Sequence, residues 1–145
     1  MYFKKYCIFR RNKIKLNSSQ MKEKFELEYL FNTSPGVLEK LLSTPSGLSE
    51  WFADDVNIKD DVYTFFWDGS SEEARLLQHR PNQKIKFKWL EDDEDEYYFE
   101  ISMKVDPMTN DLIMTITDFA YEDEIDGAEL LWDQQIDNLR RTIGA

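Results

Sequence analysis

Residues 42–56 read LSTPSGLSEWFADDV, and this stretch contains the change from helix to sheet. Thr44 and Pro45 end the helix before it, because the residue that precedes a proline is disfavoured in helical backbone. A second short helix is predicted over residues 46–52, and a strand is predicted from Val56 onward. The stretch therefore places two short helices directly before a series of strands.

The segment before this stretch predicts a strand and then a helix. Residues 24–31 alternate between apolar and charged side chains, which is typical of a half-buried antiparallel strand. Ser34 is a natural N-cap, and Pro35 suits the first helical position. A helix over residues 36–43 follows. Its apolar side is expected to consist of Val37, Leu38, Leu41 and Leu42.

The segment after the stretch predicts antiparallel strands that are separated by turns. Asp60 and Asp61 form a tight hairpin turn, and the dipeptide Asp68-Gly69 is a strong turn signal. Residues 106–110 (DPMTN) form a further turn. The expected strands are residues 56–59, 62–67, 74–79, 84–90, 97–105 and 112–121.

Residues 124–143 predict one long helix. Acidic residues fill its first turn, and Arg140 and Arg141 lie in its last turn, as the helix dipole favours. Twenty residues at about 1.5 Å each span about 30 Å, which is enough to cross a whole sheet. The apolar stripe of this helix consists of Ala128, Leu131, Trp132, Ile136, Leu139 and Ile143.

These elements predict an α+β domain. Each expected strand has one apolar face, and the long helix is the one element large enough to cover that face. We therefore expect one twisted antiparallel sheet of about seven strands wrapped around the long C-terminal helix, with two short helices after the first strand. A strongly twisted sheet around one helix often leaves a space between them, so a cavity there is a candidate site.

Three segments resemble the START-like (helix-grip, SRPBCC) superfamily, and most closely the bacterial proteins similar to the activator of the heat-shock-protein-ninety ATPase. They are residues 25–37 (FELEYLFNTSPGV), residues 42–56 and residues 132–143 (WDQQIDNLRRTI). The resemblance covers residues 21–145 and implies the fold. It implies less about function, because the superfamily includes lipid carriers, plant hormone receptors, polyketide cyclases, ring-hydroxylase subunits and co-chaperones.

Composition restricts the classes of function. A chain of 145 residues with 41% apolar residues is about one domain, and its longest apolar run is far below the roughly 18 residues of a membrane-spanning helix. Cys7 is the single cysteine, which excludes an internal disulfide and a multi-cysteine zinc site. His79 is the single histidine, which disfavours histidine metal sites and catalytic triads. We therefore predict no cofactor and no metal, and a cytoplasmic location from the thiol usage and the lack of an export signal.

Residues 1–20 differ from the rest of the chain in charge. Six of the 18 basic residues and none of the 29 acidic ones lie there, so residues 21–145 carry 12 basic and 29 acidic residues and a formal charge of −17. The apolar residues 6–9 are too few for a secretory signal, which needs about 7–15. We expect a disordered basic tail or a start codon assigned too early, with a nucleic-acid or acidic-membrane arm as the alternative. The resemblance implies that residues 21–145 form a single START-like domain, and their charge strongly disfavours nucleic-acid binding.

The aromatic residues are the main candidate binding site. Inward-facing rings would line an apolar pocket, in which tryptophan and tyrosine offer polar handles. The alternative is that the same rings fill the core. Asp118 interrupts an apolar strand, and it either orients a polar group of the ligand or faces solvent on the other side of the sheet. The predicted ligand-binding residues are Trp51, Phe52, Phe65, Trp67, Phe87, Trp89, Tyr97, Phe99, Asp118, Trp132 and Ile136.

No catalytic residue is predicted. His79 lies near a strand end without a visible acidic partner, so we expect it at the surface or in a turn rather than as a general base. Residues 91–96 (EDDEDE) are expected at a solvated hairpin tip, because adjacent carboxylates in one hairpin do not form a calcium cage.

Three functions are compatible with this sequence. The first is a non-enzymatic binding domain that holds a small apolar or amphipathic ligand in a cavity between the sheet and the C-terminal helix. The second is a co-chaperone-like protein-interaction module with a filled core, which binds a protein partner through its acidic surface or a sheet edge. The third and least favoured is an enzyme of the cyclase or hydrolase type. Neither a nucleic-acid partner nor a membrane span is expected.

Overall fold

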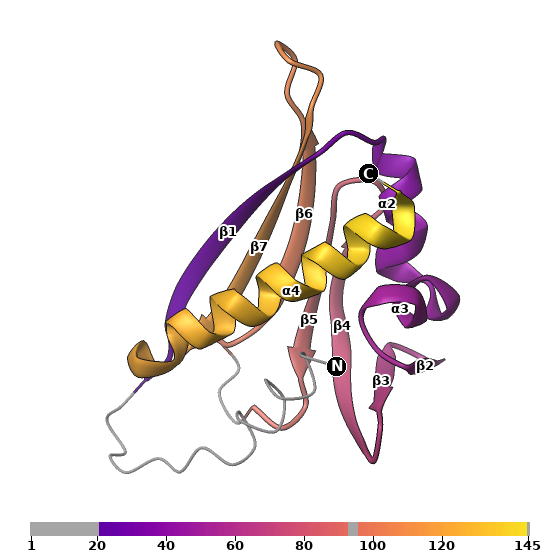
Figure 1. Ribbon diagram of the computed structural model, residues 1–145. Helices are drawn as coiled ribbons and strands as arrows, with labels where there is room; N and C mark the ends of the chain where they lie inside the picture. Colours follow the sequence, from indigo (N-terminus) through magenta and orange to yellow (C-terminus); the bar gives the residue numbers. More distant parts are fainter. Residues whose placement is uncertain (1–20, 93–95, 145) are drawn as a thin grey trace.

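The computed structural model describes residues 21–92 and 96–144 of the chain. Within these residues, one strand and two short helices precede six strands and a long helix (Figure 1). In chain order the elements are β1 (Glu23–Phe31), α2 (Pro35–Ser43), α3 (Pro45–Trp51), β2 (Asp55–Lys59), β3 (Val62–Trp67), β4 (Ser70–Arg80), β5 (Lys84–Trp89), β6 (Phe99–Val105), β7 (Leu112–Ala120), the 3-10 helix η1 (Glu122–Glu124) and α4 (Ile125–Ile143).

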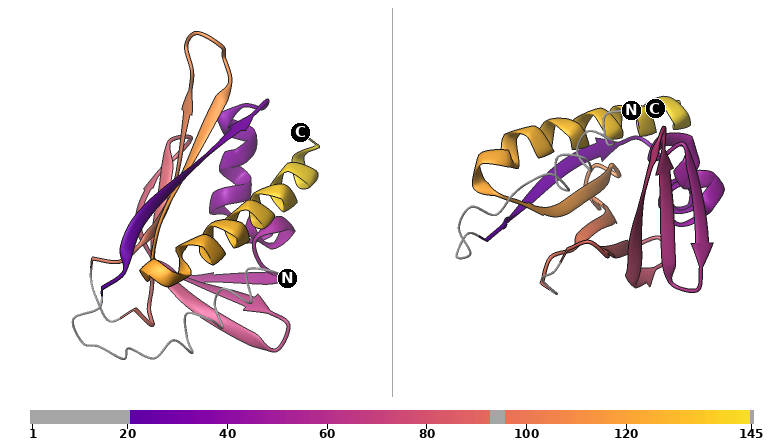
Figure 2. Two further views of the ribbon diagram at one scale, coloured as in Figure 1. Left: turned by 60° about the vertical axis from the view of Figure 1, so that its left-hand side comes forward. Right: turned by 90° about the horizontal axis from the view of Figure 1, so that it is seen from below.

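The seven strands of the described residues form one antiparallel sheet in the order β1-β7-β6-β5-β4-β3-β2. Strands β2 to β7 follow one another as a meander, whereas β1 pairs with β7 at the far edge. Helix α4 crosses one face of the sheet, and α2 and α3 lie at the end where β2 and β3 are found (Figures 1 and 2). The α+β helix-grip fold expected from the sequence is confirmed.

The two short helices are joined by a close approach of their backbones. The side-chain oxygen of Thr44 caps α3, because it accepts a hydrogen bond from the backbone N of Gly47 at 3.0 Å. A Cβ atom at Gly47 would lie 2.0 Å from the carbonyl oxygen of Lys40 on α2. Glycine is therefore the residue that fits here, and it allows α2 and α3 to pack together.

Helix α4 is attached to the first strand by two side-chain contacts. The hydroxyl of Tyr29 donates a hydrogen bond to Asp133 Oδ1 at 2.6 Å. Burial makes the largest contribution to the pKa of Tyr29, and this hydrogen bond and the charge of Asp133 add to it. Together they raise the pKa well above its usual value, so the hydroxyl remains a donor. The guanidinium of Arg140 lies 4.3 Å from the ring centre of Phe31. The first strand and the last helix of the domain therefore pack together.

Three local details differ from the expectations. Strand β4 begins at Ser70 rather than at residue 74, because the turn at Gly69, with a φ of +80°, lets pairing with β3 start at once. Strand β6 begins at Phe99 rather than at residue 97, because residues 97 and 98 belong to the connection before it. Val37 is 47% exposed, because α2 turns a different side to the core. Among the described residues, no helix is long and apolar enough to cross a membrane.

Candidate functional site

The residues predicted to bind a ligand lie mostly in the core between the sheet and α4. Nine of the eleven belong to one cluster of buried side chains, namely Trp51, Phe52, Phe65, Trp67, Phe87, Trp89, Phe99, Trp132 and Ile136. Asp118 is joined to this cluster through a hydrogen bond with Trp132. Tyr97 is the remaining residue, and it lies apart from the cluster.

The rings of this cluster pack against one another. Phe52, directly after α3, has its ring centre 4.9 Å from that of Phe65 and 6.3 Å from that of Trp132. Phe99 has its ring centre 5.0 Å from that of Trp89 and 6.1 Å from that of Trp132. These separations are typical of aromatic rings in contact. The rings form a continuous aromatic layer from α3 through the sheet to α4.

The side chains of this aromatic layer are buried. Phe65 is 0% exposed, and Trp132 and Ile136 are each 1% exposed. A ligand cavity holds about 300 Å³ or more, so the side chains in its walls would be accessible to water. These side chains are therefore inaccessible to water in the folded chain.

Two tryptophans of the layer use their indole N–H groups inside the protein. Trp51 Nε1 donates to the carbonyl oxygen of Leu41 at 2.8 Å. Trp67 Nε1 donates to the carbonyl oxygen of Phe52 at 3.1 Å. Buried polar groups are normally satisfied in this way. The two donors that were expected as handles for a ligand thus hold α3 to α2 and to β3.

Asp118 lies on the helix side of β7 and is 4% exposed. Its Oδ2 accepts a hydrogen bond from Trp132 Nε1 at 2.9 Å, and its Oδ1 accepts one from the backbone N of Phe119 at 2.8 Å. The alternative that Asp118 faces solvent is therefore wrong. Buried residues alternate along β7 from Leu112 to Ile116, and this alternation continues to Asp118. The carboxyl group connects β7 to α4.

Gln135 is a buried polar residue that sequence reasoning missed. It is 0% exposed, its Nε2 donates to the carbonyl oxygen of Phe52 at 2.9 Å, and its Oε1 accepts from Asn138 Nδ2 at 3.0 Å. A glutamine on a charged helix is usually interpreted as exposed. However, position 135 is seven residues after Ala128 and so lies on the apolar stripe. This spacing could have predicted that Gln135 is buried.

Tyr97 lies near the beginning of β1 rather than in the aromatic layer. Its hydroxyl accepts a hydrogen bond from the backbone N of Lys22 at 2.9 Å. Its ring centre is 5.4 Å from that of Phe119. Because residue 97 precedes β6, the alternation expected to carry it to the side of Phe99 does not apply.

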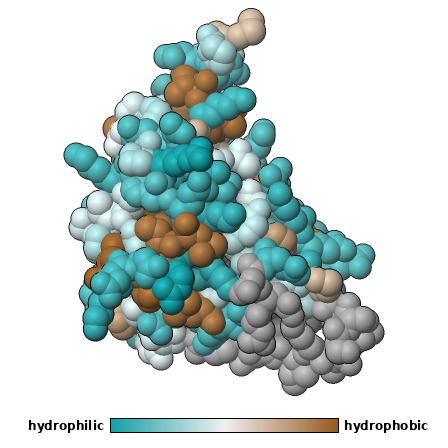
Figure 3. Space-filling model, turned by 180° about the vertical axis from the view of Figure 1, so that it is seen from behind, coloured by the Kyte–Doolittle hydropathy of each residue, from teal (hydrophilic) through white to brown (hydrophobic). Residues whose placement is uncertain are grey.

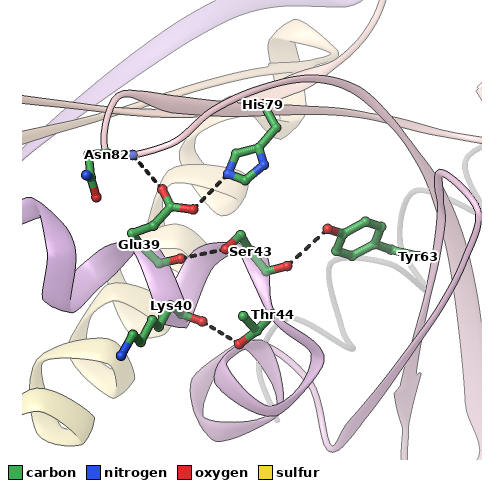
Figure 4. Close-up of polar contacts among 7 residues, drawn as sticks. All are labelled: Glu39, Lys40, Ser43, Thr44, Tyr63, His79 and Asn82. Atoms are coloured by element: carbon green, nitrogen blue, oxygen red, sulfur yellow. Dashed lines mark hydrogen bonds and ion pairs between the residues drawn. The ribbon is translucent and has the colours of Figure 1, made fainter.

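A polar cluster joins α2 to the turn between β4 and β5 (Figure 4). His79 Nε2 and Glu39 Oε2 are 2.7 Å apart, and the backbone N of Asn82 donates to Glu39 Oε1 at 2.7 Å. Burial by itself raises the pKa of Glu39, but the hydrogen bonds from Asn82 and His79 outweigh it and hold the pKa below its usual value. Sequence reasoning missed this partner of His79, because Glu39 lies 40 residues earlier on another element.

The same cluster continues through α2 to β3. Ser43 Oγ donates to the carbonyl oxygen of Glu39 at 2.8 Å, and the hydroxyl of Tyr63 donates to the carbonyl oxygen of Ser43 at 3.0 Å. Burial, and then the charge of Glu39, raises the pKa of Tyr63. Both hydroxyls are directed at backbone carbonyls, so within the described residues the cluster places no nucleophile for His79 to activate. Its contacts fasten α2 to the sheet.

The acidic run at residues 91–96 is described only in part. Residues 93–95 lie outside the described residues, as do residues 1–20 with Cys7. Asp92 Oδ1 lies 2.8 Å from Lys22 Nζ. Within residues 21–92 and 96–144, no group of three or more His, Cys, Asp and Glu side chains is arranged to hold a metal ion.

Two grooves lie on the surface near the C-terminal end of α4, and both are bordered by Glu50 and Thr142. One has a volume of about 560 Å³ and is lined by residues of α3 and α4 that include Arg141. The other has a volume of about 620 Å³ and is lined by α2 and α4, including Val37. Both are open to solvent, unlike the enclosed cavity expected between helix and sheet.

The model of the START-like superfamily domain matches residues 19–145, which include every element described above. The chain belongs to the START-like superfamily. The resemblance read from the three sequence segments is confirmed. START-like domains bind ligands or proteins.

Solved structures show the same fold. A protein from Bacteroides fragilis with a solution NMR structure is 44% identical, over 84% of this chain and 91% of that one, with a TM-score of 0.62. The Aha1 dimer from Colwellia psychrerythraea is 14% identical, over 81% of this chain and 92% of that one, with a TM-score of 0.68. A protein from Mesorhizobium loti is 18% identical, over 84% of this chain and 97% of that one, with a TM-score of 0.68. The last two likenesses show the fold alone. No curated protein matches the chain.

Proposed function

We propose that this chain is a non-enzymatic, protein-binding START-like domain. Membership of the superfamily supports binding in general, and the close packing of the buried aromatic rings favours a partner that binds at the surface. The geometry around His79 supports a non-catalytic role, because its polar contacts, together with those of Asn82, fasten Glu39 of α2 to the sheet. A cytoplasmic location stays a prediction.

The packed aromatic layer between α4 and the sheet is the observation that carries the proposal. The ring centres of Phe52, Phe99 and Trp132 are 6.1 to 6.3 Å apart in each pair. Each of the three residues is 1% exposed. A ligand between the helix and the sheet would have to separate these rings, whereas a protein partner on the surface leaves them in place.

The free energy of opening such a space favours the surface partner. A pocket of about 300 Å³, at about 24 cal/mol for each Å³ of cavity, costs about 7 kcal/mol. That is comparable with the whole stability of a typical domain, about 5–15 kcal/mol. Opening would also break the hydrogen bond between Trp132 and Asp118. A small ligand would have to offset all of this on binding.

Native mass spectrometry of the full chain, purified from cells that produce it naturally, tests the proposal. We expect one defined protein to co-purify at a fixed stoichiometry, with no small molecule retained. A retained apolar or amphipathic molecule would instead support the alternative, in which the predicted residues open into a ligand site.

Titration of the chain with neutral and anionic amphiphiles, followed by tryptophan fluorescence, is the second test. We expect no saturable change, because the rings are already packed. The proposal fails if a neutral amphiphile gives a saturable change that Ile136→Trp abolishes by filling the space. Leu130→Trp is the matched control, because Leu130 is an exposed residue of the same helix.

A further inference from the structure

Five cations gather on the outer face of the β4–β5 hairpin, the face turned away from α4. Alternation along the two strands, with a shift between Leu76 and Gln78, places them on this side. Figure 3 shows the molecule from behind, where hydrophilic side chains surround smaller hydrophobic areas. We call the five residues the basic patch: Arg75, Arg80, Lys84, Lys86 and Lys88.

The register of the hairpin places like charges directly opposite each other. Arg75 pairs with Lys88, and Arg80 pairs with Lys84. Like charges at directly opposite positions destabilise an antiparallel pair. A local arrangement that lowers stability twice in one hairpin is the kind of conflict expected at a functional surface.

The basic patch differs in sign from the rest of the domain. Residues 21–145 carry a formal charge of −17, yet five of their 12 basic residues lie in this one hairpin. A local reversal of sign of this kind directs association with negatively charged partners.

In the part of the chain that the structure describes, three carboxylates border the basic patch. Asp61 Oδ1 lies 3.0 Å from Arg75 Nη1, and Glu100 Oε1 lies 3.9 Å from Lys84 Nζ. Glu73 precedes Arg75 by two residues on the same face of β4. Lys86 pairs with Glu100 in the register of β5 and β6. Within residues 21–92 and 96–144, the five cations of the patch thus outnumber these three carboxylates.

The lysines of the patch form a row along β5. Lys84, Lys86 and Lys88 occupy alternate positions, which are about 6.8 Å apart in an antiparallel strand. Lys86 Nζ lies 4.0 Å from the ring centre of Tyr98, which supports the side chain on the outer face. Lys88 also makes further contacts. The three lysines are therefore considered together as one binding surface. An extended peptide presents its alternate side chains at the same spacing.

We propose that the basic patch binds an extended acidic segment of the partner protein. The inference rests on the proposed function, because it names the surface and the chemistry of that protein binding. Acidic side chains at alternate positions of the segment face the lysine row, and others lie beside Arg75 and Arg80. A nucleic acid fits less well, because a longer polyanion would extend from the patch over a domain with a formal charge of −17.

Fluorescence anisotropy at low salt tests the patch, with the full chain and a fluorescein-labelled peptide in which glutamate alternates with threonine. We expect Lys84→Gln/Lys86→Gln to weaken binding about fivefold through the loss of two charge contacts. Lys24→Gln/Lys40→Gln is the matched control, because it removes the same charge from exposed positions on β1 and α2. The control should change the affinity by less than about twofold, since these lysines lie far from the patch. Thermal unfolding checks that both variants fold.

Three outcomes would overturn the proposal. Equal weakening by the two double variants would mean that net charge alone matters, and no binding of the acidic peptide would mean that the patch has no such ligand. Tighter binding of single-stranded oligothymidylate than of the peptide would identify a nucleic-acid partner instead. The proposed function has a separate readout. If the protein found by native mass spectrometry binds Lys84→Gln/Lys86→Gln as well as the unmodified chain, the domain binds protein, but not through the patch.

Discussion

The carboxyl group of Asp118 lies within an interface that is otherwise mostly apolar. Such a group is costly to bury unless hydrogen bonds replace those that water would supply. Trp132 and the backbone of Phe119 each supply one. The pair of Asp118 and Trp132 therefore joins β7 to α4 by a contact that depends on both partners.

Trp132→Phe should destabilise the domain by about 1–3 kcal/mol, because it leaves the buried Asp118 without this donor. Unfolding in urea measures the change. The same substitution in an Asp118→Ala background controls for the smaller ring and should cost less. If the two substitutions are additive, the hydrogen bond is not what stabilises the interface.

Glu39 should make stability depend on pH in the acidic range. Its pKa in the folded protein lies below the usual value of 4.5, so it contributes stability above that pH and loses the contribution as the pH falls through the folded pKa. Glu39→Gln should therefore be less stable at neutral pH and lose less stability on acidification. Thermal unfolding across a pH series tests this, with the exposed Glu50→Gln as the control. Parallel curves for the unmodified chain and Glu39→Gln would contradict it.

Two helical glycines show how the α2–α3 junction differs from an ordinary helix. Gly47→Ala should cost roughly 1–3 kcal/mol or more, because the added Cβ meets the backbone of Lys40 and forces the helices apart. Gly127→Ala in α4 should instead stabilise by about 0.5–1 kcal/mol, since nothing lies within 4 Å of its Cβ. Chemical denaturation measures both. Similar effects at the two positions would mean that α2 and α3 tolerate a wider separation.

The β4–β5 hairpin should become more stable when one of its like charges is removed. Arg80→Gln relieves the repulsion with Lys84 and should stabilise by a few tenths of a kcal/mol. Lys104→Gln is the control, because the opposite residue is the uncharged Ile113. Differential scanning calorimetry compares the two midpoints. A lower midpoint for Arg80→Gln than for Lys104→Gln would show that the opposing charges are not a source of instability.

Much of the fold was predictable, because it follows from local patterns. The alternation of each strand, turns such as Asp60-Asp61 and the stripe around Trp132 placed the elements close to their observed ranges. The register shift between Leu76 and Gln78 was not predictable, because register depends on the partner strand.

The burial of the aromatic residues was predictable from the sequence, but the way in which their rings pack was not. Periodicity turns Phe52 and Trp132 toward the same core, yet only the packing of distant elements decides whether room is left between them. The contact between Glu39 and His79 was hidden for the same reason, since it joins a helix to the end of a strand far along the chain.

The charge of the whole domain should make its stability depend on salt. A formal charge of −17 over residues 21–145 implies repulsion between acidic side chains, which salt screens as the Debye length falls from about 30 Å at 0.01 M to about 8 Å at 0.15 M. The thermal midpoint should therefore rise over this range. A midpoint that falls would mean that ion pairs such as Lys22–Asp92 outweigh the repulsion.

During synthesis of the chain, β1 cannot pair until β7 has been made. Glu23 pairs with Ala120, so Glu23 is synthesised 97 residues before its partner. At about 5–20 residues per second, β1 waits for about 5–20 seconds. During this time the apolar side chains of Phe25 and Phe31 are covered by neither β7 nor α4. The nascent chain is thus prone to aggregate through β1 until β7 and α4 have been synthesised and cover it.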